Sequence, residues 1–138
     1  MSESVLATGN SIKAKGKAMT VALWAGQFLV AGILGMMAFT KFFVYTPDGS
    51  MVLAEAMGVG RGVITLIGLV ELSAAALILI PRRHTLGALL AAATMGGALF
   101  THATKIGWSG NAAAEMWPLA LVVLAAASFV ILGRRARG

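Results

Sequence analysis

Four long apolar stretches, separated by short polar segments, dominate the pattern of this sequence. They run over residues 20–43, 62–80, 84–104 and 115–132. A helix needs about 20 residues to cross the hydrocarbon core of a bilayer, and each stretch approaches or exceeds that length. None of them alternates between polar and apolar residues as the strands of a membrane barrel do. The pattern predicts an all-α integral membrane protein, built as a bundle of four transmembrane helices.

Composition supports this class of protein. Hydrophobic residues make up 59% of the 138 residues and charged residues 12%, with a mean hydropathy of +0.88. Ordinary soluble domains contain about 45–50% and about 25% of these classes. The chain has no cysteine, which excludes disulfides, iron–sulfur clusters and thiol relays. No metal site is expected either, because the outer histidine, His102, has no second ligand of that kind beside it.

The basic residues divide the chain and orient it. A polar tail (residues 1–19) precedes the membrane domain (residues 20–133), and a short basic segment (residues 134–138) follows it. Most of the 11 Lys and Arg residues lie in three places: the tail, the link between the second and third stretches, and the C-terminus. They are Lys13, Lys15, Lys17, Arg82, Arg83, Arg134, Arg135 and Arg137. The positive-inside rule places all three segments in the cytoplasm, which predicts an N-in, C-in topology.

The net charge of +6 does not indicate nucleic acid, because the basic residues flank apolar spans and no base-reading motif is present. We expect the lipid bilayer to be the main partner. In the first outer link, Pro47 and Gly49 predict a turn. The sequence "SMVLAEAM" then predicts a short interfacial helix that Ser50 caps and Gly58 ends.

Small residues recur one helical turn apart within the spans, which favours close packing of helices in lipid. The pairs are Ala31 and Gly35, Gly87 and Ala91, Ala92 and Gly96, and Ala93 and Gly97.

One carboxylate interrupts the second stretch. Glu71 is the only charged residue between Gly62 and Ile80, and it lies near the middle of the membrane. An ionisable group at that depth costs at least about 2.5 kcal/mol on insertion scales. We therefore expect Glu71 to face the interior of the bundle, where it is protonated, ion-paired or hydrogen-bonded. Two roles stay open: a functional group that handles protons, and a structural carboxyl that joins helices.

Other polar side chains extend from Glu71 toward the outer end of the bundle. With the N-in topology, the outer third contains Lys41, Arg61, His102 and Lys105. Thr94 is expected near the depth of Glu71, and Gln27 nearer the cytoplasm, so that together they could form one polar line. Because Glu71 lies deeper than the outer residues, the sequence does not decide whether any of them pairs with it. Snorkelling of Lys41 and Lys105, and an interfacial anchor at Arg61, are the alternatives. His84, at the inner start of the third stretch, is expected to have no special role.

Three motifs together resemble the DoxX-like membrane family. They are "GMMAFTKFF" at the end of the first stretch, "GLVELSAAALILIP" in the second and "GALFTHATK" at the end of the third. The family pattern has a lysine at the outer end of helix 1, a G-x-x-E within helix 2 and a G-A-x-x-T-H at the end of helix 3. Lys41, Glu71 and the pair Thr101 and His102 match these places. The resemblance covers residues 20–133 and implies a four-helix bundle in the inner membrane of a prokaryote.

The resemblance also implies a function. The family is named after the small subunit of a thiosulfate–quinone oxidoreductase, so we expect a small membrane subunit of a quinone-linked redox complex. Glu71 would handle protons, and the residues around it would bind a quinone or another lipid: Lys41, Arg61, Thr94, His102 and Lys105. No covalent cofactor is expected, and electrons would come from a partner subunit. The alternative is a non-catalytic subunit for structure or assembly, which meets hetero- or homo-oligomeric partners through its Ala and Gly faces.

Overall fold

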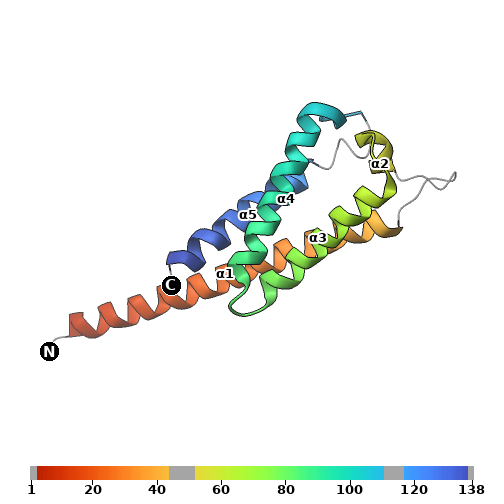
Figure 1. Ribbon diagram of the computed structural model, residues 1–138. Helices are drawn as coiled ribbons and strands as arrows, with labels where there is room; N and C mark the ends of the chain where they lie inside the picture. The colour runs from red at the N-terminus through yellow and green to blue at the C-terminus, as the bar shows by residue number, and fades with distance from the viewer. Residues whose placement is uncertain (1–2, 44–51, 111–116, 137–138) are drawn as a thin grey trace.

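The computed structural model describes residues 3–43, 52–110 and 117–136, and every regular element in these ranges is helical. The helices are α1 (Glu3–Phe43), α2 (Val52–Met57), α3 (Arg61–Leu79), α4 (His84–Thr101) and α5 (Trp117–Ala136). A π-helical turn, η1 (His102–Ile106), continues α4. Figure 1 shows the four long helices side by side, with α2 at the end of the bundle opposite the two termini.

The four predicted spans are confirmed as helices. Among the described residues, α1, α3, α4 with η1, and α5 are each long and apolar enough to cross a membrane. The largest difference lies at the N-terminus, where α1 begins at Glu3 and includes the described part of the predicted tail in a single helix of 41 residues. At 1.5 Å per residue this helix is about 61 Å long, and its first turns project beyond the bundle (Figure 1).

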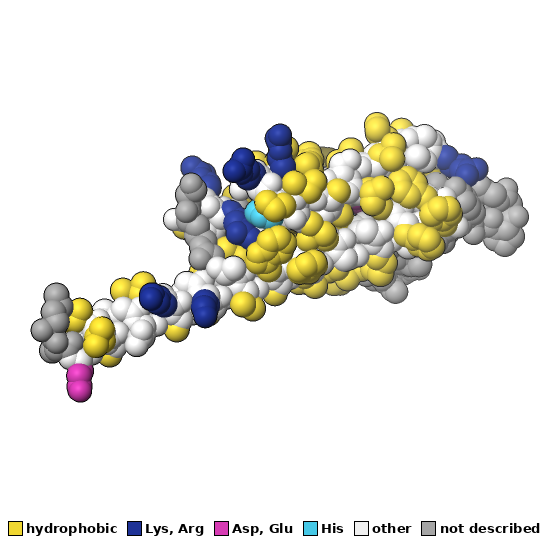
Figure 2. Space-filling view, turned by 90° about the horizontal axis from the view of Figure 1, so that it is seen from below, with side chains coloured by type: hydrophobic (Ala, Val, Ile, Leu, Met, Phe, Trp, Pro, Cys, Tyr) yellow, Lys and Arg dark blue, Asp and Glu magenta, His cyan; other side chains and the backbone are white. Residues whose placement is uncertain are grey.

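The long helices surround one shared core. Helix α1 packs against α3 and α5, and α4 packs against the same two helices from the opposite corner. The core contains fully buried side chains from all four helices, including Val30, Leu34, Ile78, Met95 and Val123. The outer faces are apolar as well, as Figure 2 shows, and they expose large side chains such as Leu66, Phe100 and Leu132. Apolar side chains on both faces are expected where lipid rather than water surrounds a bundle.

One of the small-residue pairs marks a very close helix contact. A Cβ added at Gly87 would overlap the backbone of α3. It would collide with Ile78 N and would lie 2.7 Å from Ile78 Cα. Glycine at this position therefore lets α4 lie directly against the end of α3. The other predicted glycines differ, since a Cβ at Gly35, Gly96 or Gly97 would meet no atom within 4 Å. Those three positions do not determine the packing within this chain.

The predicted short helix is present as α2, and Gly58 ends it in the expected way. Gly58 has φ +68°, its N–H donates to Glu55 O, and the Val59 N–H donates to Ala54 O. These hydrogen bonds form a Schellman motif, in which glycine occupies the left-handed position. The expected turn at Pro47 and Gly49 and the expected cap at Ser50 lie outside the described residues, as does Glu115 at the predicted start of the fourth span.

Candidate functional site

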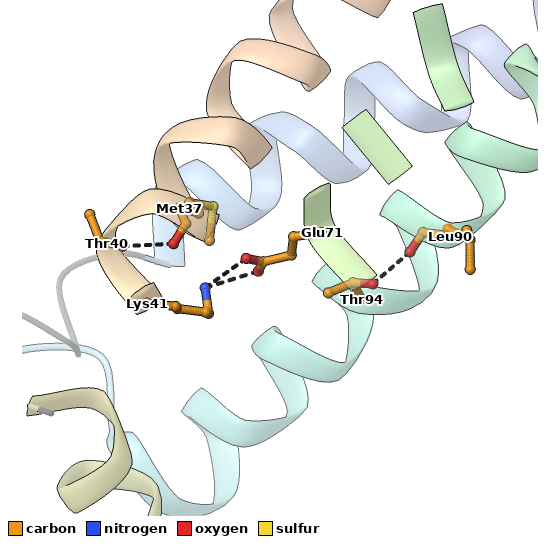
Figure 3. A network of polar contacts seen from close by, with 6 residues as sticks. All are labelled: Met37, Thr40, Lys41, Glu71, Leu90 and Thr94. Atoms are coloured by element: carbon orange, nitrogen blue, oxygen red, sulfur yellow. Dashed lines mark hydrogen bonds and ion pairs between the residues drawn. The ribbon is translucent and has the colours of Figure 1, made fainter. Parts of the chain in front are cut away.

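A buried ion pair connects the first two spans. Lys41 Nζ donates to both carboxylate oxygens of Glu71, at 3.0 Å to Oε1 and 2.9 Å to Oε2 (Figure 3). The two side chains are only 6% and 2% exposed. Glu71 lies ten residues into α3, about 15 Å from its start, so the pair is well inside the apolar part of the bundle. The structure thus pairs the mid-membrane carboxylate with one of the four outer residues.

Gly68 explains how Lys41 comes so close to Glu71. It lies one helical turn before Glu71 on α3, and a Cβ at this position would lie 3.4 Å from Lys41 Cβ and 3.0 Å from the ring of Phe42. The end of α1 therefore packs directly on Gly68. From there the lysine side chain extends along α3 to the carboxylate one turn deeper. The G-x-x-E motif provides a carboxylate and also the space through which its partner reaches it.

The sequence left open whether Lys41 pairs with Glu71 or snorkels to the interface. The side chain is buried rather than snorkelled, and its four-carbon stem spans the difference in depth between the two residues. Depth estimates that place each charge at the height of its own Cα miss this reach.

The other predicted site residues do not join the pair in one polar line. Thr94 is half-buried and donates its hydroxyl hydrogen to Leu90 O within its own helix (Figure 3). Arg61 and Lys105 are exposed at the start of α3 and in η1.

His102 is buried, but its contacts are with the end of its own segment. Nδ1 lies 2.9 Å from Gly107 O, the ring stacks on Trp108 at 5.7 Å, and His102 O accepts from the Gly107 N–H at 2.8 Å. These contacts close the π-helical turn, in which Gly107 has φ +83°. Because a carbonyl only accepts, Nδ1 is the donor to Gly107 O.

A second polar cluster lies at the opposite end of the bundle. Gln27 is fully buried on α1, and its Nε2 donates to Ile78 O at 2.9 Å. Its Oε1 accepts from Nε of Arg134 at 2.9 Å and also from Nη2. His84 Nδ1 lies 2.7 Å from Ile78 O, so two donors converge on this one carbonyl at the end of α3.

This cluster was not predicted. The sequence placed Gln27 on the polar line of Glu71, expected no special role for His84 and assigned Arg134 to the C-terminal segment. The signal that could have found it is Gln27 itself, an amide inside an apolar span at the same depth as a basic helix end. A buried amide needs a hydrogen-bond partner for its oxygen and another for its nitrogen. The guanidinium can only donate, so its contact fixes which atom of the Gln27 amide is the oxygen.

The chemistry available at the two places differs. The Lys41–Glu71 ion pair holds transferable protons inside the apolar bundle. The described residues contain no group of three or more metal-ligating side chains. The Gln27 cluster joins four helices, α1, α3, α4 and α5, through hydrogen bonds.

Fold and site together define an all-helical chain that has four helices able to cross a membrane and an ion pair buried between two of them. Comparisons with family models, with curated proteins and with solved structures found no match. The likeness to the DoxX-like family therefore rests on the three sequence motifs.

Proposed function

We propose that this protein is a small multi-pass membrane subunit of a quinone-linked redox complex, in which Lys41 and Glu71 handle protons. The observation that carries the proposal is the burial of an ammonium and a carboxylate against each other within the membrane-spanning part of the bundle. Ionisable groups within membrane spans are rare and mark proton or substrate pathways. The DoxX-like motifs, which contain both residues, support the same assignment.

The proposed chemistry is proton delivery. Reduction of a quinone consumes two electrons and two protons and forms two O–H bonds. The electrons come from a redox centre in a partner subunit. The ammonium–carboxylate pair gives one proton to a quinone oxygen as the electrons arrive and regains one from water at the nearer membrane surface before the second transfer. General acid catalysis of this kind requires the group within hydrogen-bond reach of the oxygen, directly or through one water.

The orientation is part of the proposal. Both termini lie at the same end of the bundle (Figure 1), and the basic residues of the tail, of the link after α3 and of the end of α5 lie at that end. The positive-inside rule then favours the cytoplasm for this end, in a prokaryotic inner membrane.

A second candidate function is a non-catalytic subunit for structure or assembly. One observation favours it: Lys41 supplies a hydrogen bond to each oxygen of Glu71, so the pair can join α1 to α3 with no ligand involved. In this case the glycines without close neighbours in the chain, Gly35, Gly96 and Gly97, would meet helices of partner subunits.

The first experiment is purification of the tagged full chain from its own membranes in mild detergent, with mass spectrometry of the proteins and lipids that accompany it. We expect a quinone and a protein that contains a redox centre. Recovery of the chain with partners that have no redox centre, and with no quinone, would favour the assembly role.

A double variant separates the two functions. Lys41→Met with Glu71→Leu removes both charges but keeps apolar bulk, so the bundle should still fold and assemble. Proton handling predicts loss of quinone reduction by the assembled complex, measured with a short-chain quinone analogue. The assembly role predicts an unchanged rate. Glu71→Asp, which keeps the carboxylate, serves as the matched control and should retain measurable activity.

A further inference from the structure

The end of the bundle that holds the Gln27 cluster also carries a dense positive surface. Arg82 and Arg83 are exposed in the link between α3 and α4, and Arg135 is exposed at the end of α5. Figure 2 shows Lys and Arg side chains gathered at this end, where the projecting part of α1 leaves the bundle. The described acidic residues lie elsewhere, with Glu3 at the far tip of α1, Glu55 in α2 and Glu71 within α3. No described carboxylate therefore neutralises this surface.

The link between α3 and α4 has a backbone that its sequence does not favour. The Arg83 N–H donates to Ile80 O at 3.0 Å, which closes a four-residue turn with Pro81 at its second position and Arg82 at its third. Arg82 has φ +70°, the one positive φ among the described residues other than glycine. A turn with proline second and positive φ third is of type II, where glycine or asparagine is strongly preferred. An arginine that is kept in a strained conformation suggests a role for its side chain.

The neighbouring cluster holds the helix ends under this surface in place. Arg134 bonds Gln27 and lies over the ring of Trp24 at 5.6 Å, and the Trp24 ring meets His84 edge-on at 5.2 Å. The end of α5, the start of α4 and the middle of α1 are thus tied together. The arginines of the link and of α5 thus project from helix ends that these contacts tie together.

Apolar side chains border the basic surface on the side of the bundle. Ile80 is 47% exposed, Leu86 45% and Leu132 69%. A surface that places exposed apolar groups next to a row of arginines matches a phospholipid, whose acyl chains and phosphate are joined in the same order. Basic surfaces at the ends of membrane helices bind anionic headgroups in this way, and the planar guanidinium suits phosphate well.

We propose that Arg82, Arg83 and Arg135 form a binding site for the headgroup of an anionic phospholipid, which bridges the α3–α4 link and the end of α5. The site is independent of the proposed redox function, because it lies at the other end of the bundle from Lys41 and Glu71.

Thermal unfolding of the purified full chain in a neutral detergent tests this site. We expect phosphatidylglycerol to raise the unfolding midpoint more than phosphatidylcholine at the same concentration. The triple variant Arg82→Gln, Arg83→Gln, Arg135→Gln should lose most of this difference. The control is a second triple variant, Lys13→Gln, Lys15→Gln, Lys17→Gln, which removes the same amount of charge from the projecting part of α1. It should keep the difference between the two lipids. Equal loss in the two triple variants, or equal effects of the two lipids, would overturn the proposal. The same rise with inorganic phosphate would show a site for free phosphate and would also overturn it.

A single substitution keeps the test valid should the triple arginine variant misfold. Arg82→Gly fits the turn better than arginine, so it should unfold at a higher temperature than the wild type without anionic lipid. Phosphatidylglycerol should raise the unfolding midpoint of Arg82→Gly by less than it raises that of the wild type. An undiminished gain in Arg82→Gly would show that this side chain does not take part.

Discussion

Gly68 and Phe42 are in close contact, so any side chain larger than hydrogen at position 68 requires the Phe42 ring to give way by a few tenths of an ångström. A Cβ there would lie 3.0 Å from Phe42 Cε1 and 3.1 Å from Cζ. The same contact holds the end of α1 against α3, one turn from Glu71. The space that glycine leaves at this point thus favours the approach of Lys41 to Glu71.

Gly68→Ala should therefore weaken the ion pair without touching either charge. The methyl group would push Phe42 and the start of the Lys41 side chain away from α3, and overpacking of this kind costs about 1–3 kcal/mol. We expect a lower unfolding midpoint in detergent. Gly62→Ala on the same helix, where a Cβ would meet nothing within 4 Å, is the control and should change it little. Equal effects of the two substitutions would contradict the packing argument.

Removal of one partner of the pair should be far more harmful than removal of both. Lys41→Met leaves Glu71 buried without its cation, a change that typically costs about 3–5 kcal/mol. The double variant with Glu71→Leu contains no buried charge, and such replacements are often neutral or stabilising. Unfolding midpoints of the wild type, the two single variants and the double variant form a complete cycle. Additive effects of the two single substitutions would argue against a direct pair.

Gly87→Ala should disrupt the packing of α4 on α3. The added methyl would overlap the backbone at Ile78, which cannot move aside as a flexible side chain would. Gly96→Ala on the same helix is a matched control, since its Cβ would have no neighbour within 4 Å. We expect Gly87→Ala to reduce the yield of folded monodisperse protein on size-exclusion chromatography and Gly96→Ala to leave it unchanged. Should Gly96→Ala have the larger effect, its helix face would contact another subunit.

The Gln27 cluster should behave as one unit. Gln27→Leu removes the acceptor of Arg134 and one of the two donors to Ile78 O, and unsatisfied buried groups cost about 1–3 kcal/mol each. In a double-mutant cycle with Arg134→Leu, we expect a coupling energy of about 0.5–3 kcal/mol, read from chemical denaturation. A coupling near zero would mean that the two side chains do not interact in the folded protein.

The helices could be predicted from the sequence because lipid limits the alternatives so strongly. Each apolar run had to be a helix of spanning length, and Gly58 ended α2 as its turn chemistry predicts. The extension of α1 to Glu3 could not be predicted, because the polar residues of the tail face no core and leave no apolar period there. The absence of proline before Thr20 permits a helix there but does not predict one.

Most residues of the site could be singled out from the sequence, but the contacts between them could not. Glu71 and Lys41 were both singled out, whereas their contact depends on the direction of a long side chain and on a glycine one turn away. The contact between Gln27 and Arg134 joins residues 107 positions apart. The predicted topology places both residues toward the same end of the bundle, but the sequence does not tell which side chains meet there.

The unbroken course of α1 has a structural consequence. Residues 3–19 extend the first span by 17 residues of continuous helix, a rod about 25 Å long. Lys41 lies near the other end of the same helix, so no break in the hydrogen-bonded helix separates Ser4 from the buried ion pair. The exposed arm, the contact of Phe42 with Gly68 and the buried ion pair therefore share one continuous helix.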